Sequence, residues 1–262
     1  MPYQYLHFSI NDRLATITLN RPQASNSFHI DFARELEQVT RLCQTNREIG
    51  AVLINANGKM FSGGGDLENM ADHFDSIDLM LKELADCLHT AYANIMRLEV
   101  PVVVAVNGPA AGIGLSLALL GDIILASDKA SFVPAYAKVG LSPDGALTYL
   151  LPRLIGVQRA QEMLLCSRAL SAEQAESWGM VNRVVPAEQL AEQSVTLATQ
   201  LANGPTNSFA SIKKLLALSE TQSLESQMHF EGIELSKNST TADAKEGISA
   251  FLNKTKPVFT GR

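Results

Sequence analysis

Apolar and polar residues in the first half of the chain follow two periods, one typical of strands and one typical of helices. The predicted strands lie at 3–10, 13–19, 51–55, 101–106 and 122–126. The predicted helices lie at 29–45 and 79–97, followed by a short one that ends near residue 120. Asn11-Asp12 separates the first two strands and predicts a hairpin. Strands that alternate with helices in this order predict an α/β fold with parallel strands.

The second half of the chain has an almost wholly helical pattern. The predicted helices lie at 144–151, 156–166, 171–178, 186–203, 205–219, 223–236 and 240–254, with one short strand at 181–185. Residues 1–200 therefore form the predicted core, and residues 201–262 form a helical C-terminal region. The apolar faces of that region bury either on the chain's own core or on a neighbouring subunit, and we favour the subunit. These faces carry Phe230, Ile233, Ile248, Phe251 and Leu252. Residues 68–78, rich in acidic side chains, predict a mobile, solvated connection.

Composition narrows the classes of function. Of 262 residues, 46% are hydrophobic and 18% are charged, which suits a folded domain with a full core. The net charge of −6 disfavours non-specific binding to nucleic acid or membranes. No apolar run approaches the ~18 residues of a membrane span, and no secretory leader is evident. Three scattered cysteines predict neither a zinc site nor a disulfide framework, so we expect a cytoplasmic protein without a metal.

Two glycine-bearing segments are the main candidates for chemistry. Phe61–Leu67 (FSGGGDL) and Asn107–Ala118 (NGPAAGIGLSLA) each follow a predicted strand and lead into a predicted helix. Such turns leave main-chain N–H groups without partners. Two of them on neighbouring strands could aim two donors at one oxygen, as in an oxyanion hole.

These segments and several others, in this order and spacing, resemble the crotonase superfamily, also called the enoyl-CoA hydratase/isomerase family. The resemblance spans essentially the whole chain. It rests on Asn20-Arg21-Pro22 with Asn26-Ser27, both glycine segments, Gly121–Ala126, Leu151-Pro152-Arg153, Ala172–Ala175, Trp178–Val181 and the tail Phe251–Phe259. Within the family, the chain is most similar to the branch of phenylacetate-pathway ring-epoxide isomerases and enoyl-CoA isomerases.

The resemblance implies a crotonase-like spiral of ββα units that binds an acyl-CoA thioester. It also implies a homotrimer, or a dimer of trimers, assembled through the C-terminal helices. The oxyanion-hole donors would be the N–H groups of Gly65 and Ile113, and coenzyme A would enter only as part of the substrate. The residues implied in binding substrate or CoA are Ala24, Ser25, Ser27, Gly63, Asp66, Leu67, Gly112, Ser116, Tyr136, Lys254 and Phe259. Lys254 and Phe259 would come from an adjacent subunit.

The reaction depends on which acid–base residues are present. The family's hydratases activate water with two glutamates, and this chain has Ser116 and Tyr136 at those positions. The remaining candidate is Asp144. The segment that contains it resembles the isomerase branch most closely. We therefore expect an isomerase in which Asp144 removes a proton from the thioester's alpha carbon and returns it to the gamma carbon. Without the resemblance, Asp144 could simply cap the helix predicted at 144–151.

Other readings of the same scaffold stay open. Thioester hydrolysis and atypical hydration are alternatives to isomerisation, and so is a non-catalytic CoA-binding paralogue. Dehalogenation of a 4-chlorobenzoyl thioester is disfavoured, because the histidine of those enzymes would fall on Ala93 and their tryptophan on Tyr136. His29, His73 and His89 are expected to be surface or packing residues.

Overall fold

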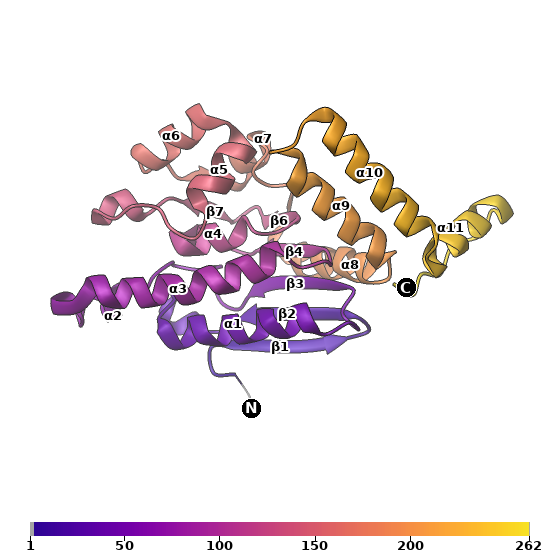
Figure 1. Cartoon of the computed structure of the whole chain (residues 1–262). Coiled ribbons are helices and arrows are strands. Elements are labelled where there is room, and N and C mark those ends of the chain that lie inside the picture. Colours follow the sequence, from indigo (N-terminus) through magenta and orange to yellow (C-terminus); the bar gives the residue numbers. More distant parts are fainter. Residues whose placement is uncertain (1–2, 262) are drawn as a thin grey trace.

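A computed structural model describes residues 3–261 (Figure 1). The strands are β1 Leu6–Asn11, β2 Leu14–Leu19, β3 Ala51–Ala56, β4 Val102–Val106, β5 Ala110–Ala111, β6 Ile123–Ser127, β7 Ser131–Val133, β8 Leu170–Ser171 and β9 Arg183–Val185. The helices are α1 Ile30–Thr45, α2 Leu67–Ala71, α3 Ile77–Met96, α4 Ile113–Ala118, α5 Leu147–Ile155, α6 Val157–Leu165, α7 Ala172–Ser177, α8 Leu190–Ala202, α9 Thr206–Ser219, α10 Leu224–Ser239 and α11 Ala242–Asn253. Four 3-10 turns complete the description: η1 Pro22–Ala24, η2 Phe74–Ser76, η3 Tyr136–Val139 and η4 Ala187–Gln189.

A six-stranded sheet in the order β1-β2-β3-β4-β6-β9 forms the centre of the fold. β1 runs antiparallel to β2, and every other neighbouring pair is parallel. The expected hairpin is confirmed, although its turn is at Asp12-Arg13, one residue later than expected. Both turn residues have positive φ, as a two-residue hairpin connection requires. The predicted α/β fold with parallel strands is therefore correct.

Helices cover both faces of this sheet. α8 packs on one face, where Leu190, Ala198 and Ala202 are buried against strand residues such as Leu53 and Val103. α1, α3 and α4 contribute to the larger core on the other face. The strands at the centre are apolar on both faces because both faces are covered, which explains why their sequences are continuous apolar runs. No helix within residues 3–261 is both long and apolar enough to cross a membrane.

A second, small sheet in the order β5-β7-β8 was not predicted from the sequence. Its strands are two or three residues long, too short to produce an alternating pattern. β5 begins four residues after β4 ends, so the chain leaves the main sheet and at once enters the small one. The connection at 68–78, predicted to be solvated, is largely exposed, and it contains α2, η2 and the start of α3.

The C-terminal helices leave the body of the molecule. Figure 1 shows α10 and α11 extending outward from the side that α9 occupies. Their apolar side chains are not buried on the chain's own core, and Phe251 is 85% exposed. Other exposed apolar residues of this region are Leu216, Leu224, Met228, Ile233, Leu235, Ile248, Leu252 and Val258. The chain's own core therefore does not bury these faces, so the alternative that the sequence disfavoured is not seen.

Two consecutive left-handed residues form the turn that precedes α5. Gly145 has φ +64°, and Ala146 has φ +63° and ψ +11°. A Cβ at Gly145 would clash with Cδ1 of Ile113 and would lie 2.8 Å from Cε2 of Tyr92, so only glycine fits there. Ala146 is exposed and meets no such obstacle, but its side chain carries the strain of a left-handed conformation.

We predict that Ala146→Gly stabilises the protein. Glycine adopts the left-handed conformation without the Cβ penalty, which outweighs its greater freedom in the unfolded chain. The free energy of unfolding should rise by about 0.5–1 kcal/mol, as measured by denaturant unfolding. The matched control is Ala217→Gly, at an exposed position inside α9, which should lower it by a similar amount. A loss of stability in both variants would contradict the strain at Ala146.

Candidate functional site

The two glycine-bearing segments meet in the structure. Ser62 and Ala110 form a parallel bridge, and the N–H of Ala111 donates to the carbonyl of Ser62 over 2.8 Å. At Gly64, which has φ +94°, a Cβ would lie 2.8 Å from the carbonyl oxygen of Ala111. The backbones of the two segments could not approach this closely with a larger residue at position 64.

This contact places two main-chain donors beside one cavity. Gly65 and Ile113 both line a hollow of about 370 Å³. Within residues 3–261, no main-chain acceptor is found for the N–H of Gly65. Ile113 is the first residue of α4, so its N–H has no carbonyl one turn earlier to bind. Both positions expected to form an oxyanion hole are thus brought to the same cavity.

The walls of this cavity are mainly apolar. Leu67 and Met70 come from α2, and Leu81, Leu84 and Leu88 come from α3. The lining also includes Ala135, Tyr136, Val139 and Leu141 from η3 and the segments around it, and its polar groups include Asp144. An apolar hollow with a few convergent polar groups is typical of a small-molecule site.

Two hydroxyl groups hold the main chain of Asp144 in place. Its carbonyl oxygen accepts a hydrogen bond from Oγ of Ser116 at 2.7 Å and a longer one from the hydroxyl of Tyr136 at 3.4 Å. Ser116 is fully buried and does not line the cavity, although it was expected to bind substrate. Burial raises the pKa of Tyr136, so its hydroxyl keeps its proton and can donate. The two positions at which the family's hydratases carry glutamates thus support Asp144 here.

The carboxylate of Asp144 does not cap α5, so the capping alternative is wrong. α5 begins at Leu147, and no side chain caps it. Instead, Oδ1 of Asp144 lies 2.6 Å from Nε2 of His89, on α3. His89 is exposed, as expected for a surface residue, but it also contacts the carboxylate of Asp144. His89 lies one helical turn before Ala93, the position on which the histidine of the dehalogenases was expected to fall.

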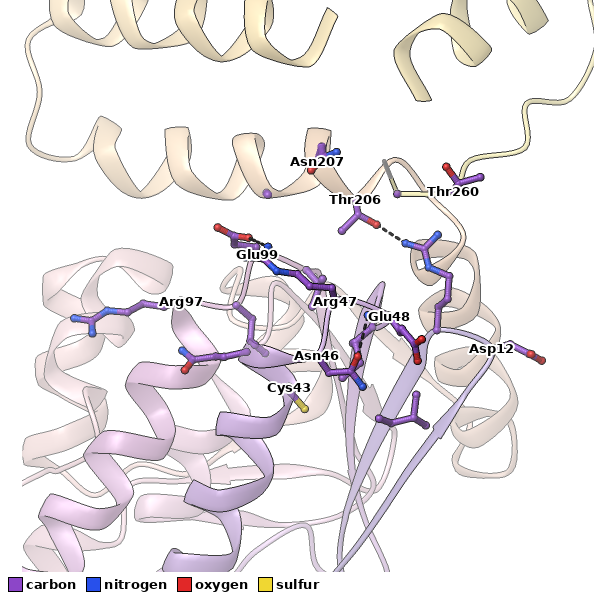
Figure 2. A pocket seen from close by; sticks show the side chains of 18 residues that line it. Asp12, Cys43, Asn46, Arg47, Glu48, Arg97, Glu99, Thr206, Asn207 and Thr260 are labelled. Carbon is purple, nitrogen blue, oxygen red and sulfur yellow. Dashed lines mark hydrogen bonds and ion pairs between the residues drawn. The ribbon is translucent and has the colours of Figure 1, made fainter. Parts of the chain in front are cut away.

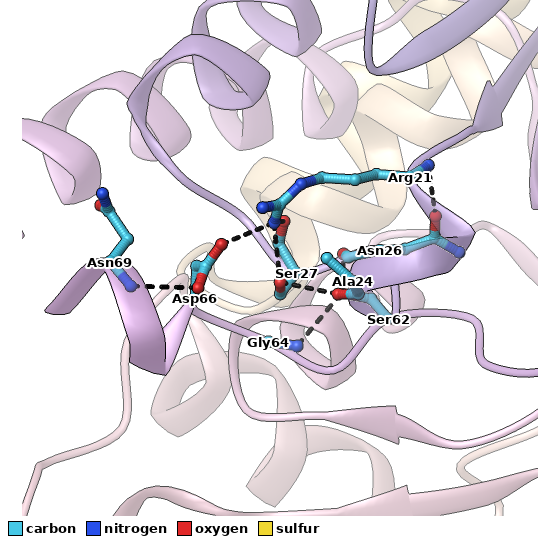
Figure 3. Close-up of polar contacts among 8 residues, drawn as sticks. All are labelled: Arg21, Ala24, Asn26, Ser27, Ser62, Gly64, Asp66 and Asn69. Carbon is cyan, nitrogen blue, oxygen red and sulfur yellow. Dashed lines mark hydrogen bonds and ion pairs between the residues drawn. The ribbon is translucent and has the colours of Figure 1, made fainter. Parts of the chain in front are cut away.

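An ion pair braces the loop that follows the first glycine segment (Figure 3). Nη1 of Arg21 lies 2.6 Å from Oδ2 of Asp66, and the N–H of Asn69 donates to Oδ1 of the same carboxylate. Burial raises the pKa of Asp66, but these two hydrogen bonds outweigh it and hold the pKa below its usual value. Asp66 caps α2 in this way, so its carboxylate is already occupied.

The residues after Arg21-Pro22 lie against the same loop. The N–H of Gly63 donates to the carbonyl of Ser25 at 2.7 Å, and Oγ of Ser27 donates to the carbonyl of Ala24 at 2.7 Å. Ala24, Ser25, Ser27 and Gly63, all expected at the CoA groove, are therefore neighbours. Of these four, Gly63 lines the cavity, as do Leu67 and Gly112.

Lys254 and Phe259 lie elsewhere. Lys254 ends α11, and Phe259 packs against Gly247 of that helix. Neither lines the cavity of its own chain. Their expected part in CoA binding therefore depends on an adjacent subunit.

A wider cleft, of about 940 Å³, lies at another end of the sheet (Figure 2). Its lining includes Arg13, Arg47 and Arg97, but also Asp12, Glu48 and Glu99. Arg13 donates to the hydroxyl of Thr206, and the charges of Arg47 and Glu99 neutralise one another as an ion pair. It contains none of the expected site residues and is not the candidate site.

Within residues 3–261, no group of three or more acidic, histidine or cysteine side chains is placed to hold a metal ion.

Comparisons with known proteins identify the family of this chain. The family model described as Enoyl-CoA hydratase/isomerase matches residues 9–262. The chain is 35% identical to a trans-2-decenoyl-[acyl-carrier-protein] isomerase of Streptococcus mutans, with 100% of both chains covered. It is 37% identical to a 1,2-epoxyphenylacetyl-CoA isomerase of Escherichia coli, with 99% of both covered.

A solved structure shows the same fold. An enoyl-CoA hydratase of Polaromonas sp. JS666 superimposes with a TM-score of 0.92 at 30% identity, covering 97% of this chain and 99% of that one. The resemblance seen in the sequence motifs is therefore confirmed, and the chain belongs to the enoyl-CoA hydratase/isomerase family, the crotonase superfamily.

Proposed function

We propose that the protein is an acyl-CoA isomerase that moves a double bond from the delta-3 to the delta-2 position, or carries out a related ring-epoxide isomerisation. One observation carries this proposal: Asp144 lines the cavity that Gly65 and Ile113 also line. The two positions used for water activation in hydratases hold Ser116 and Tyr136, which have no carboxylate. One acid–base group beside two main-chain donors suits a proton shift better than hydration.

The chemistry requires only groups that the chain supplies. The thioester carbonyl accepts hydrogen bonds from the N–H groups of Gly65 and Ile113, which lowers the cost of enolate formation. Loss of one such donor in other enzymes costs about 2.7–4 kcal/mol of transition-state stabilisation. Asp144 takes the proton from the alpha carbon, and as a carboxylic acid it returns that proton to the gamma carbon. One carboxylate suffices because the base becomes the acid, and no cofactor beyond the substrate's own CoA is needed.

The surroundings of the cavity support a CoA thioester with an apolar acyl group. The acyl group would lie along Leu81, Leu84 and Leu88 of α3, where its burial stabilises the complex. The CoA portion would follow the groove formed by Ala24, Ser25, Ser27, Gly63 and Asp66. Lys254 and Phe259 of a neighbouring subunit would reach its phosphates and adenine. The exposed apolar faces of α10 and α11 support assembly into a trimer or a dimer of trimers.

We predict that Asp144→Asn abolishes isomerisation of 3-enoyl-CoA. The amide cannot accept the alpha proton, but it is nearly isosteric with the carboxylate and leaves the carbonyl contact of Ser116 intact. Turnover is measured by absorbance of the conjugated 2-enoyl thioester, with circular dichroism and thermal unfolding as controls for folding. Turnover at the wild-type rate in this variant rules out Asp144 as the base.

A substrate panel separates this proposal from its alternatives. The panel contains 3-enoyl-, 2-enoyl-, arylacetyl- and 4-chlorobenzoyl-CoA. Free thiol release indicates thioester hydrolysis, loss of 2-enoyl absorbance indicates hydration, and chloride release indicates that Asp144 attacks the ring. CoA binding without turnover on every member identifies a non-catalytic paralogue. The proposed isomerase forms conjugated product from 3-enoyl-CoA and releases neither thiol nor chloride.

We also predict that Phe251→Asp weakens the assembly of the protein. A charge placed in an apolar interface is costly to bury, so light scattering should give a smaller mass than for the wild type. The matched control is Asn253→Asp, an exposed position of α11 that points away from Ile248, Phe251 and Leu252, and it should leave the mass unchanged. A wild-type mass equal to that of one chain, 28.3 kDa, would contradict assembly through these helices.

A further inference from the structure

His89 is the one titratable side chain that contacts the carboxylate of Asp144 within residues 3–261, and the proton shift proposed above makes no use of it. We propose that His89 is a positioning residue, which ties Oδ1 of Asp144 in place so that Oδ2 faces the alpha and gamma carbons of the substrate. This inference rests on the proposed isomerase function and specifies how its base is oriented.

The contact joins elements that are remote in the sequence. His89 lies on α3, one residue after Leu88, which lines the cavity. Its Nε2 lies 2.6 Å from Oδ1 of Asp144, across a separation of 55 residues. The side chains of His89 and Asp144 are 50% and 35% exposed, so the pair stands at the edge of the cavity and not inside the core. α3 thus supplies both part of the apolar wall and a polar contact to the base.

The main-chain contacts of Asp144 leave its carboxylate free to rotate. Ser116 and Tyr136 bind the carbonyl oxygen, which fixes the backbone but not the side-chain torsions. His89 makes the only side-chain contact to the carboxylate among the described residues, and it engages only Oδ1. A hydrogen bond to a charged acceptor is short and directional, and it therefore selects one orientation of the carboxylate. The second oxygen, Oδ2, is left to accept a proton.

The protonation states follow from the chemistry of the two groups. An ionised carboxylate can only accept hydrogen bonds, so Nε2 of His89 must carry the hydrogen in the resting state. During the reaction, the bond from the alpha carbon to hydrogen breaks and an Oδ2–H bond forms. That Oδ2–H bond then breaks as the gamma carbon gains the hydrogen. Because His89 holds Oδ1, rotation of the acid's proton toward water is restrained between these two steps.

This role can be tested by isotope transfer as well as by rate. The probe is 3-hexenoyl-CoA labelled with deuterium at both C2 positions, converted in ordinary water. Wild-type enzyme should deliver part of the C2 label to C4, as measured by mass spectrometry at early conversion. His89→Leu, which removes the donor, should lower kcat about 10- to 100-fold, change KM less than about twofold and reduce the label found at C4. His89→Gln, whose amide can still donate, should recover most of both quantities.

The matched control is His7→Leu, which removes an exposed histidine of β1 that does not line the cavity. This variant should leave kcat and the label found at C4 unchanged. If His89→Leu keeps the wild-type kcat and label transfer while Asp144→Asn is inactive, the role of His89 is overturned and the isomerase function stands. If Asp144→Asn is active, the proposed function fails and this inference fails with it. If His89→Leu and His89→Gln lose activity equally with label transfer unchanged, His89 does not position the base.

Discussion

The close approach of two glycine-bearing segments is the contact on which the rest of the site depends. β3 and β4 are neighbours in the main sheet, so the segments that follow them leave the same edge. The bridge between Ser62 and Ala110 keeps the two segments side by side beyond the sheet. Glycine at position 64 permits this close approach, because a Cβ there would have no room beside Ala111. Rigid parallel strands thus determine where the donors of Gly65 and Ile113 lie.

α4 connects these donors to the proposed base. Its first residue, Ile113, supplies one N–H, and Ser116, one turn later, binds the carbonyl of Asp144. The hydroxyl of Tyr92 donates to the carbonyl of Ile113 at 2.8 Å and joins α3 to the same helix. One buried turn of α4 therefore determines how far the N–H of Ile113 lies from Asp144. A loop alone could not fix this separation as closely.

Most of the fold could be predicted from the sequence, because the long elements have clear periods. The hairpin, the apolar strands β3, β4 and β6, and the helices α1 and α3 all follow from such patterns. The small sheet could not be predicted, since strands of two or three residues leave no period. The family motifs indicated Gly65, Ile113 and Asp144 as site residues. The partnership of His89 with Asp144 could not be predicted, because tertiary packing brings α3 beside a residue 55 positions away.

The replacement of two acids by Ser116 and Tyr136 has an electrostatic consequence for the reaction. An enolate is an anion, and each carboxylate beside it opposes its formation. Two unit charges 4 Å apart repel by about 4 kcal/mol at an effective dielectric constant of 20. With neutral hydroxyl groups at both positions, the carboxylates that line the cavity among residues 3–261 are Asp144 and Asp78, and Asp144 becomes neutral as the enolate forms. Negative charge then moves from the protein to the substrate, and no second anion accumulates beside it.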